Sequence, residues 1–154
     1  MSGERAERFV VLSLRLLAVG FASTGILFLA APNGVLDVLD DVGEWFGSFT
    51  PAPDTGAKLW LTLGFSYMVV IAALCVVAQA DVVRYRALLL VLAAGKAASS
   101  LVALGFYVFD ADVFAYLLNF LLDGSLVGIA IWLWTLVGRV PSAAATGTPS
   151  TAPV

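Results

Sequence analysis

Hydrophobic and polar positions divide the chain into four long apolar stretches separated by charged or proline-containing segments. These stretches cover residues 9–31, 59–80, 87–109 and 114–137. A hydrocarbon core of about 30 Å needs about 20 helical residues, so each stretch is long enough to cross a bilayer. The pattern therefore predicts an all-α membrane protein, built as a four-transmembrane-helix bundle with short connections after its second and third helices.

The segment between the first two spans predicts a fifth, shorter helix. Apolar and acidic side chains there recur at helical spacing over about 34–47, and Asn33 is of a residue type that caps helix N-termini. The helix would be amphipathic and extracytoplasmic. Its polar residues are all acidic, whereas helices that bind lipid surfaces usually carry lysine or arginine. We therefore expect it to pack on the rim of the bundle or on a partner.

Lysine and arginine positions predict the orientation in the membrane. Five arginines fall on one side of the predicted spans and Lys58 falls on the other; the five are Arg5, Arg8, Arg84, Arg86 and Arg139. The positive-inside rule then places both termini in the cytoplasm, as in a bacterial-type inner-membrane protein. Residues 1–138 would form one membrane domain, and the segment 139–154, rich in Pro, Ser, Thr and Ala, would be a disordered cytoplasmic tail. The first span is long for a cleavable signal peptide and contains Arg15, so we expect a membrane helix there rather than a signal peptide.

Composition narrows the classes of function. Hydrophobic residues make up 61% of the 154 residues and charged residues 12%, with a mean hydropathy of +0.99, which excludes a water-soluble globule. The net charge of −3 argues against nucleic acid as a partner. The chain has no histidine and one cysteine, which excludes histidine-ligated haem, Cys/His zinc sites and intramolecular disulfides within it. We expect no cofactor, and Cys75 is predicted to be a packing residue.

Three ionisable residues fall inside the predicted spans: Arg15, Lys96 and Asp123. Each costs roughly 2.5–3.5 kcal/mol on insertion scales, so each needs a compensating interaction. Lys96 and Asp123 lie on consecutive spans that form a hairpin, and their depths differ by about 7 Å, within reach of an extended lysine. The spacing predicts a Lys96–Asp123 pair.

Polar residues accompany both charges and define a candidate intramembrane site. Ser99 and Ser100 follow Lys96 by three and four positions, while Asn119 and Tyr116 precede Asp123 by four and seven. If these stripes face each other, Lys96 can donate to Asp123, Ser100 or Asn119. The pair then has three interpretations: a structural tie that fixes helix register, a polar site or proton path, or a contact with polar residues of another subunit.

Arg15 has two interpretations. It either extends to the cytoplasmic headgroups or approaches Lys96 and forms a cationic pocket with it. Small residues four apart, at Gly95, Ser99 and Ala103 and again at Gly124 and Gly128, predict close helix packing.

The opening stretch Leu14-Arg15-Leu16-Leu17, with Gly20, Phe21 and Gly25 after it, resembles the first helix of the DoxX-like small four-helix membrane proteins. The resemblance covers this helix and the four-span layout. It implies a subunit or accessory of a membrane oxidoreductase assembly, with no redox centre of its own.

Three functional hypotheses are consistent with these features. The first is an accessory or structural component of a membrane complex, with the lipid bilayer and other membrane subunits, or further copies of the chain, as partners. The second is a small proton- or ion-coupled transporter or channel that uses Asp123 as a protonatable site and Lys96 as its modulator. The third, which the residues favour least, is an enzyme acting on lipid through Asp110, Asp112 and Tyr116.

Overall fold

The computed structural model describes residues 3–54 and 56–140, and within them it contains five helices. They are α1 (Gly3–Ala30), α2 (Pro32–Glu44), α3 (Lys58–Ala80), α4 (Ala87–Phe109) and α5 (Phe114–Val137). Among the described residues, α1, α3, α4 and α5 are long and apolar enough to cross a membrane. The prediction of an all-α, multi-pass membrane protein with four long apolar helices and one short helix is confirmed. The predicted tail lies outside the described residues from position 141 onward.

Two helix starts differ from the prediction. α1 begins at Gly3 rather than near residue 9, because the helix continues through the charged first turns, where Glu4 suits the positive end of the helix dipole. α2 begins at Pro32, and its N-cap is Ala31, without a side-chain capping bond. The prediction of Asn33 as the cap is therefore wrong. Proline fits the first helical turn because its missing N–H would have no intrahelical partner there.

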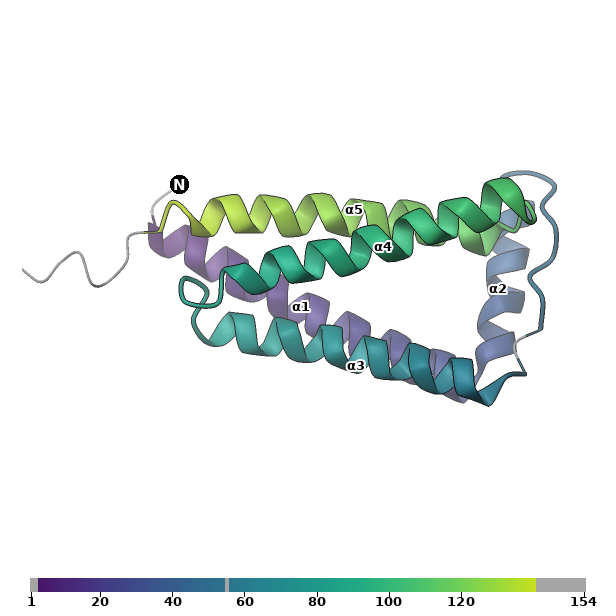
Figure 1. Cartoon of the computed structure of the whole chain (residues 1–154), viewed down its shortest axis with the longest axis horizontal. Coiled ribbons are helices and arrows are strands. Elements are labelled where there is room, and N and C mark those ends of the chain that lie inside the picture. The colour runs from purple at the N-terminus through teal and green to yellow at the C-terminus, as the bar shows by residue number, and fades with distance from the viewer. Residues whose placement is uncertain (1–2, 55, 141–154) are drawn as a thin grey trace, which may run out of the picture.

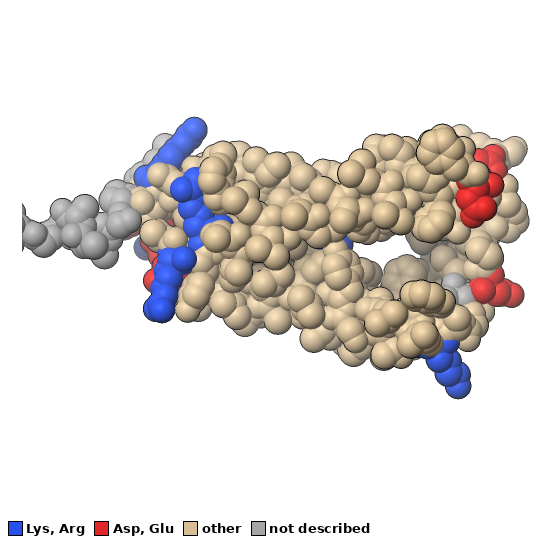
Figure 2. Space-filling model, in the orientation of Figure 1, with Lys and Arg blue, Asp and Glu red and all other residues tan. Residues whose placement is uncertain are grey.

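The four long helices form two antiparallel pairs, α1 with α3 and α4 with α5 (Figure 1). The pairs lie close together where α1 begins and α5 ends, and they diverge toward α2, which crosses the open end. We call the closed end the arginine end, because Arg5, Arg8, Arg84, Arg86 and Arg139 belong to the segments that meet there. The opposite end is the α2 end. Basic side chains gather at the first and acidic ones at the second, where Lys58 also lies (Figure 2).

Small and apolar residues hold α1 against α3. Buried positions on α1 recur at intervals of three to four residues, at Val10, Leu14, Ala18 and Phe21, and so form one apolar face. A Cβ built at Gly25 would lie only 2.9 Å from Cβ of Met68, so the glycine allows the two helices to approach closely.

α2 packs against the start of α5. The Phe46 ring stacks on that of Phe114 at 5.8 Å between centroids, and the Phe49 ring meets Phe114 edge-on at 5.2 Å. The backbone N–H of Thr50 donates to the carbonyl of Asp112 at 3.3 Å. These contacts hold α2 and the segment after it against the start of α5.

Candidate functional site

Lys96 and Asp123 form an ion pair in the middle of the bundle. Nζ of Lys96 lies 2.9 Å from Oδ1 of Asp123 and donates a hydrogen bond to it. Their side chains are 2% and 7% exposed. The short connection between α4 and α5 sets the register that brings the two residues together, and the pairing leaves neither charge alone in an apolar environment.

The Lys96 ammonium also faces two aromatic rings of the other helix pair. It lies 4.6 Å from the centroid of Phe21 on α1 and 5.5 Å from that of Tyr67 on α3. The negative face of an aromatic ring attracts a cation, and the attraction is stronger away from water. Lys96 on α4 therefore contacts the other three long helices, at the boundary between the α1–α3 pair and the α4–α5 pair.

Ser100 lies next to the pair but has another partner. Its hydroxyl donates to the carbonyl of Phe120 on α5 at 2.9 Å, and a Cβ built at Gly124 would lie 3.3 Å from its Oγ. Ser100 therefore bonds across to α5, and Gly124 leaves the space that lets α4 and α5 approach closely there. Lys96 therefore pairs with Asp123, whereas Ser100 hydrogen-bonds to the α5 backbone.

Ser99, Tyr116 and Asn119 line a separate groove of about 560 Å³ between α3 and the α4–α5 pair. We call it the lateral groove; its lining residues are Tyr67, Gly95, Ala98, Ser99, Val102, Ala103, Phe106, Tyr116 and Asn119. Asn119 donates to the Ser99 hydroxyl at 3.4 Å, and the Tyr116 ring lies 5.7 Å from that of Phe106. Lys96 and Asp123 are not among the lining residues. The predicted polar cluster is therefore divided into a closed ion pair and an open groove.

Tyr67 and Phe21 are the residues that sequence reasoning missed. In the part of the chain that the structure describes, Oη of Tyr67 is the one buried side-chain oxygen or nitrogen without a hydrogen-bond partner. A Cβ built at Gly95 would lie 3.3 Å from this oxygen, so the glycine leaves room for the hydroxyl. The position of Tyr67 was a usable signal, because tyrosines in membrane proteins concentrate at the interfaces and this one lies near mid-span.

Arg15 lies apart from the ion pair. Its Nε donates to Oε1 of Gln79, in the last turn of α3 at the arginine end, at 3.0 Å. Lys96 lies deeper in the bundle, about 13 Å along α4 from the start of that helix at the arginine end, at a rise of 1.5 Å per residue. The structure therefore does not bring Arg15 and Lys96 into one cationic pocket, and it agrees with a side chain that extends to the membrane surface.

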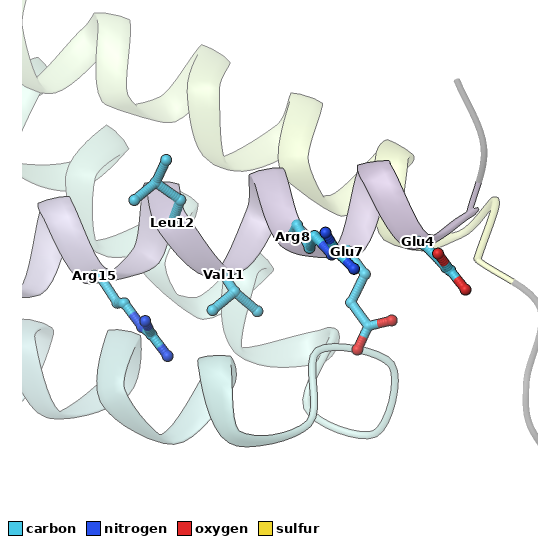
Figure 3. Close-up of a pocket in the computed structure, with 6 residues that line it drawn as sticks. All are labelled: Glu4, Glu7, Arg8, Val11, Leu12 and Arg15. Atoms are coloured by element: carbon cyan, nitrogen blue, oxygen red, sulfur yellow. The ribbon is translucent and has the colours of Figure 1, made fainter.

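Arg15 borders a second hollow, of about 530 Å³, along the start of α1. Its lining residues are Glu4, Glu7, Arg8, Val11, Leu12 and Arg15. These side chains point in different directions along one helix (Figure 3). They do not converge on a common point where a ligand could be held.

Asp112 and Tyr116, two of the residues proposed for lipid chemistry, have separate partners. A carboxylate oxygen of Asp112 accepts a hydrogen bond from the Thr50 hydroxyl, while Tyr116 packs against Phe106. Cys75 is a free, buried cysteine with 1% exposure, in the apolar core where a packing residue belongs.

Comparisons of this chain with family models, curated proteins and solved structures found no match. The resemblance of the first helix to DoxX-like proteins therefore stays a prediction. The chain's own residues and their geometry carry the functional argument.

Proposed function

We propose that this protein is an accessory or structural component of a membrane complex, in which the Lys96–Asp123 pair ties the four membrane helices together. The observation that carries the proposal is the position of the Lys96 ammonium, 2.9 Å from Asp123 on α5 and within 4.6 Å of the Phe21 ring on α1. A buried charge with partners on every other long helix penalises alternative packings, because any shift would leave it unpaired.

Exposed aromatic residues at the α2 end support a partner. Trp45 is 82% exposed and Phe46 is 73% exposed, directly after α2. Tryptophan and phenylalanine are enriched in the contact surfaces of proteins. Another membrane subunit or a second copy of the chain would cover them, in line with the assembly that the DoxX-like resemblance implies.

We further propose a bacterial-type inner membrane, with the arginine end in the cytoplasm.

The geometry favours this tie over a transporter. Proton or ion coupling at Asp123 requires water to reach its carboxylate, yet the side chain is 7% exposed and the lateral groove is lined by other residues. A transporter would also show flux in reconstituted vesicles that Asp123→Asn abolishes, and such a result would replace the tie as the explanation of the pair.

The tie is tested with Lys96→Met, Asp123→Leu and the double variant. Each single variant leaves one buried group unpaired and should lower the free energy of unfolding by about 3–5 kcal/mol, whereas the double variant should be near wild type. The reaction of buried Cys75 with a small maleimide in detergent micelles reports unfolding. A double variant that is less stable than both single variants would contradict the tie.

The partner is tested separately with a photoreactive phenylalanine analogue at Trp45 in native membranes. The proposal expects a discrete protein adduct, either a homodimer or a second subunit. The matched control is the analogue at Val70, which is 56% exposed in the middle of α3 and should meet lipid. Identical patterns at the two positions would contradict a partner at the α2 end.

A further inference from the structure

The hollow along the start of α1 carries charges of both signs, and they are arranged by depth. We call it the α1 hollow; its lining residues are Glu4, Glu7, Arg8, Val11, Leu12 and Arg15. Arg15 donates to Gln79 in the last turn of α3, so it lies at the level where that membrane helix ends. Arg8, Glu7 and Glu4 lie about 11, 12 and 17 Å further out along α1, at a rise of 1.5 Å per residue. The positive groups are therefore nearer the bilayer than the negative ones.

The charged groups of the α1 hollow have no counter-charge of their own. In the part of the chain that the structure describes, the one ion pair is that of Lys96 with Asp123. The two glutamates and two arginines of the hollow are all exposed. Among the described residues, Arg15 hydrogen-bonds through Nε alone, which leaves both terminal nitrogens of its guanidinium able to donate to a ligand.

The shape of the α1 hollow suits an elongated molecule. Its side chains share no common point, but Arg15, Val11 and Glu7 extend to the same side of α1, the side on which α3 lies (Figure 3). Val11 lies between the guanidinium and the carboxylate. A molecule lying along this side of α1 would meet a positive, an apolar and a negative group in turn.

This order of charges matches a zwitterionic phospholipid. Such a lipid places its acyl chains in the hydrocarbon, its phosphate at the membrane surface and its amine beyond the phosphate. Arginine is suited to phosphate because its planar group can donate two parallel hydrogen bonds. A primary ammonium has three N–H groups that a carboxylate can accept, whereas a quaternary ammonium has none. A headgroup with only negative charge would leave the two glutamates without a counter-charge.

We propose that the α1 hollow binds the headgroup of a zwitterionic phospholipid that carries a primary amine, of the phosphatidylethanolamine type. Its phosphate lies between Arg8 and Arg15, and its ammonium donates to Glu4 or Glu7. This site is independent of the Lys96–Asp123 tie.

The proposal is tested by carbodiimide cross-linking in phosphatidylcholine vesicles that contain a minor fraction of phosphatidylethanolamine. A membrane-permeant carbodiimide activates carboxylates, and a primary amine in contact with one then forms an amide. We expect lipid adducts at Glu4 and Glu7 to exceed, by at least about fivefold, those at the exposed acidic residues of α2, which are Asp37, Asp41 and Glu44. Phosphatidylserine carries the same amine with an added carboxylate, so repulsion by the glutamates should lower its yield at equal mole fraction.

Arginine variants separate binding from random collision. Arg15→Gln removes a charge of the hollow but keeps a side chain that can hydrogen-bond to Gln79. The matched control, Arg5→Gln, removes one charge at an exposed residue that does not line the hollow. Arg15→Gln should lower the adduct yield about threefold, a modest effect because exposed charge contacts are weak, and Arg5→Gln should leave it unchanged. Cys75 should stay protected from maleimide in both.

Three results would overturn the proposal. Equal yields in the two variants, or equal yields from phosphatidylethanolamine and phosphatidylserine, would assign the adducts to random contact. Glycerophosphoethanolamine has the same headgroup without acyl chains and should not compete; loss of the lipid adducts on its addition would identify a soluble ligand in place of a lipid. None of these results depends on the stability comparison that tests the tie.

Discussion

The ammonium nitrogen of Lys96 lies 4.6 Å from the centroid of the Phe21 ring, so a charge on α4 meets an aromatic ring on α1. The two residues belong to different helix pairs, and their contact joins those pairs inside the bundle. The same ammonium is neutralised by Asp123 on α5. One lysine thus carries both the hairpin contact and the contact between pairs.

Replacing Phe21 by leucine should weaken the junction between the two helix pairs. The variant retains an apolar side chain but loses the aromatic face, and we expect a loss of about 1–2 kcal/mol in the free energy of unfolding. A double-mutant cycle with Lys96→Met isolates the interaction, measured by denaturant unfolding in micelles. Strictly additive effects of the two substitutions would show that the ring contributes packing alone.

Gly43 should tolerate no side chain, because a Cβ built there would lie 2.8 Å from Cβ and Cγ of Phe114. We expect Gly43→Ala to push α2 away from α5 and to cost about 1–3 kcal/mol. The matched control is Gly34→Ala on the same helix, where the nearest atom would be 3.9 Å away, at Ala31. Alanine there should stabilise the helix by up to about 1 kcal/mol. Hydrogen exchange in α2 distinguishes the two, and equal protection would argue against close packing at Gly43.

Arg86 should anchor the α3–α4 connection to the last turns of α5. Its Nε donates to the Trp134 carbonyl at 2.9 Å, and its guanidinium carbon lies 3.9 Å from the centroid of the Trp134 ring. Arg86→Lys keeps the charge but loses the planar stacking, and we expect a loss of about 1–2 kcal/mol. Arg84→Lys is the control, since Arg84 lies 5.4 Å over the neighbouring Tyr85 within its own connection. Equal melting temperatures for the two variants would contradict the anchoring role.

The arginine end should face the cytoplasm. In a Cys75→Ala background, single cysteines replace two exposed residues: Ser48, after α2, and Asp81, after α3. A membrane-impermeant maleimide should label Ser48→Cys on intact cells and Asp81→Cys only after the membrane is opened. The reverse pattern would invert the proposed topology.

Much of the fold could be predicted from local pattern. Each span is long, apolar and bounded by charge or proline, and a bilayer leaves helices as the main way to satisfy the backbone of such a segment. The acidic and apolar alternation after the first span likewise predicted the short helix, although it misplaced the cap at Asn33. The short connection between α4 and α5 made the difference in depth between Lys96 and Asp123 calculable, because it fixes the register of the hairpin.

The candidate site could be predicted only in part, because neighbours on a helix differ in direction by about 100° per residue. Ser99 and Ser100 looked like one polar group, yet Ser100 bonds to the α5 backbone and Ser99 lines the lateral groove. Arg15 lay within the first span, but its partner, Gln79, became visible only when α3 was placed beside α1.

The sequence by itself therefore determined the four membrane helices, the short helix and the pairing of Lys96 with Asp123, since hydrophobicity, helix length and a short hairpin connection set all three. Only the tertiary structure decided how the α1–α3 pair meets the α4–α5 pair, and with it the contacts of Lys96 with Phe21 and Tyr67 and the groove beside them. The physical reason is that these helices are apolar on their lipid-facing and their packed sides alike, apart from a few polar residues. Hydrophobicity therefore does not determine which faces of the helices meet. Close packing and a few polar contacts between residues distant in the sequence determine it.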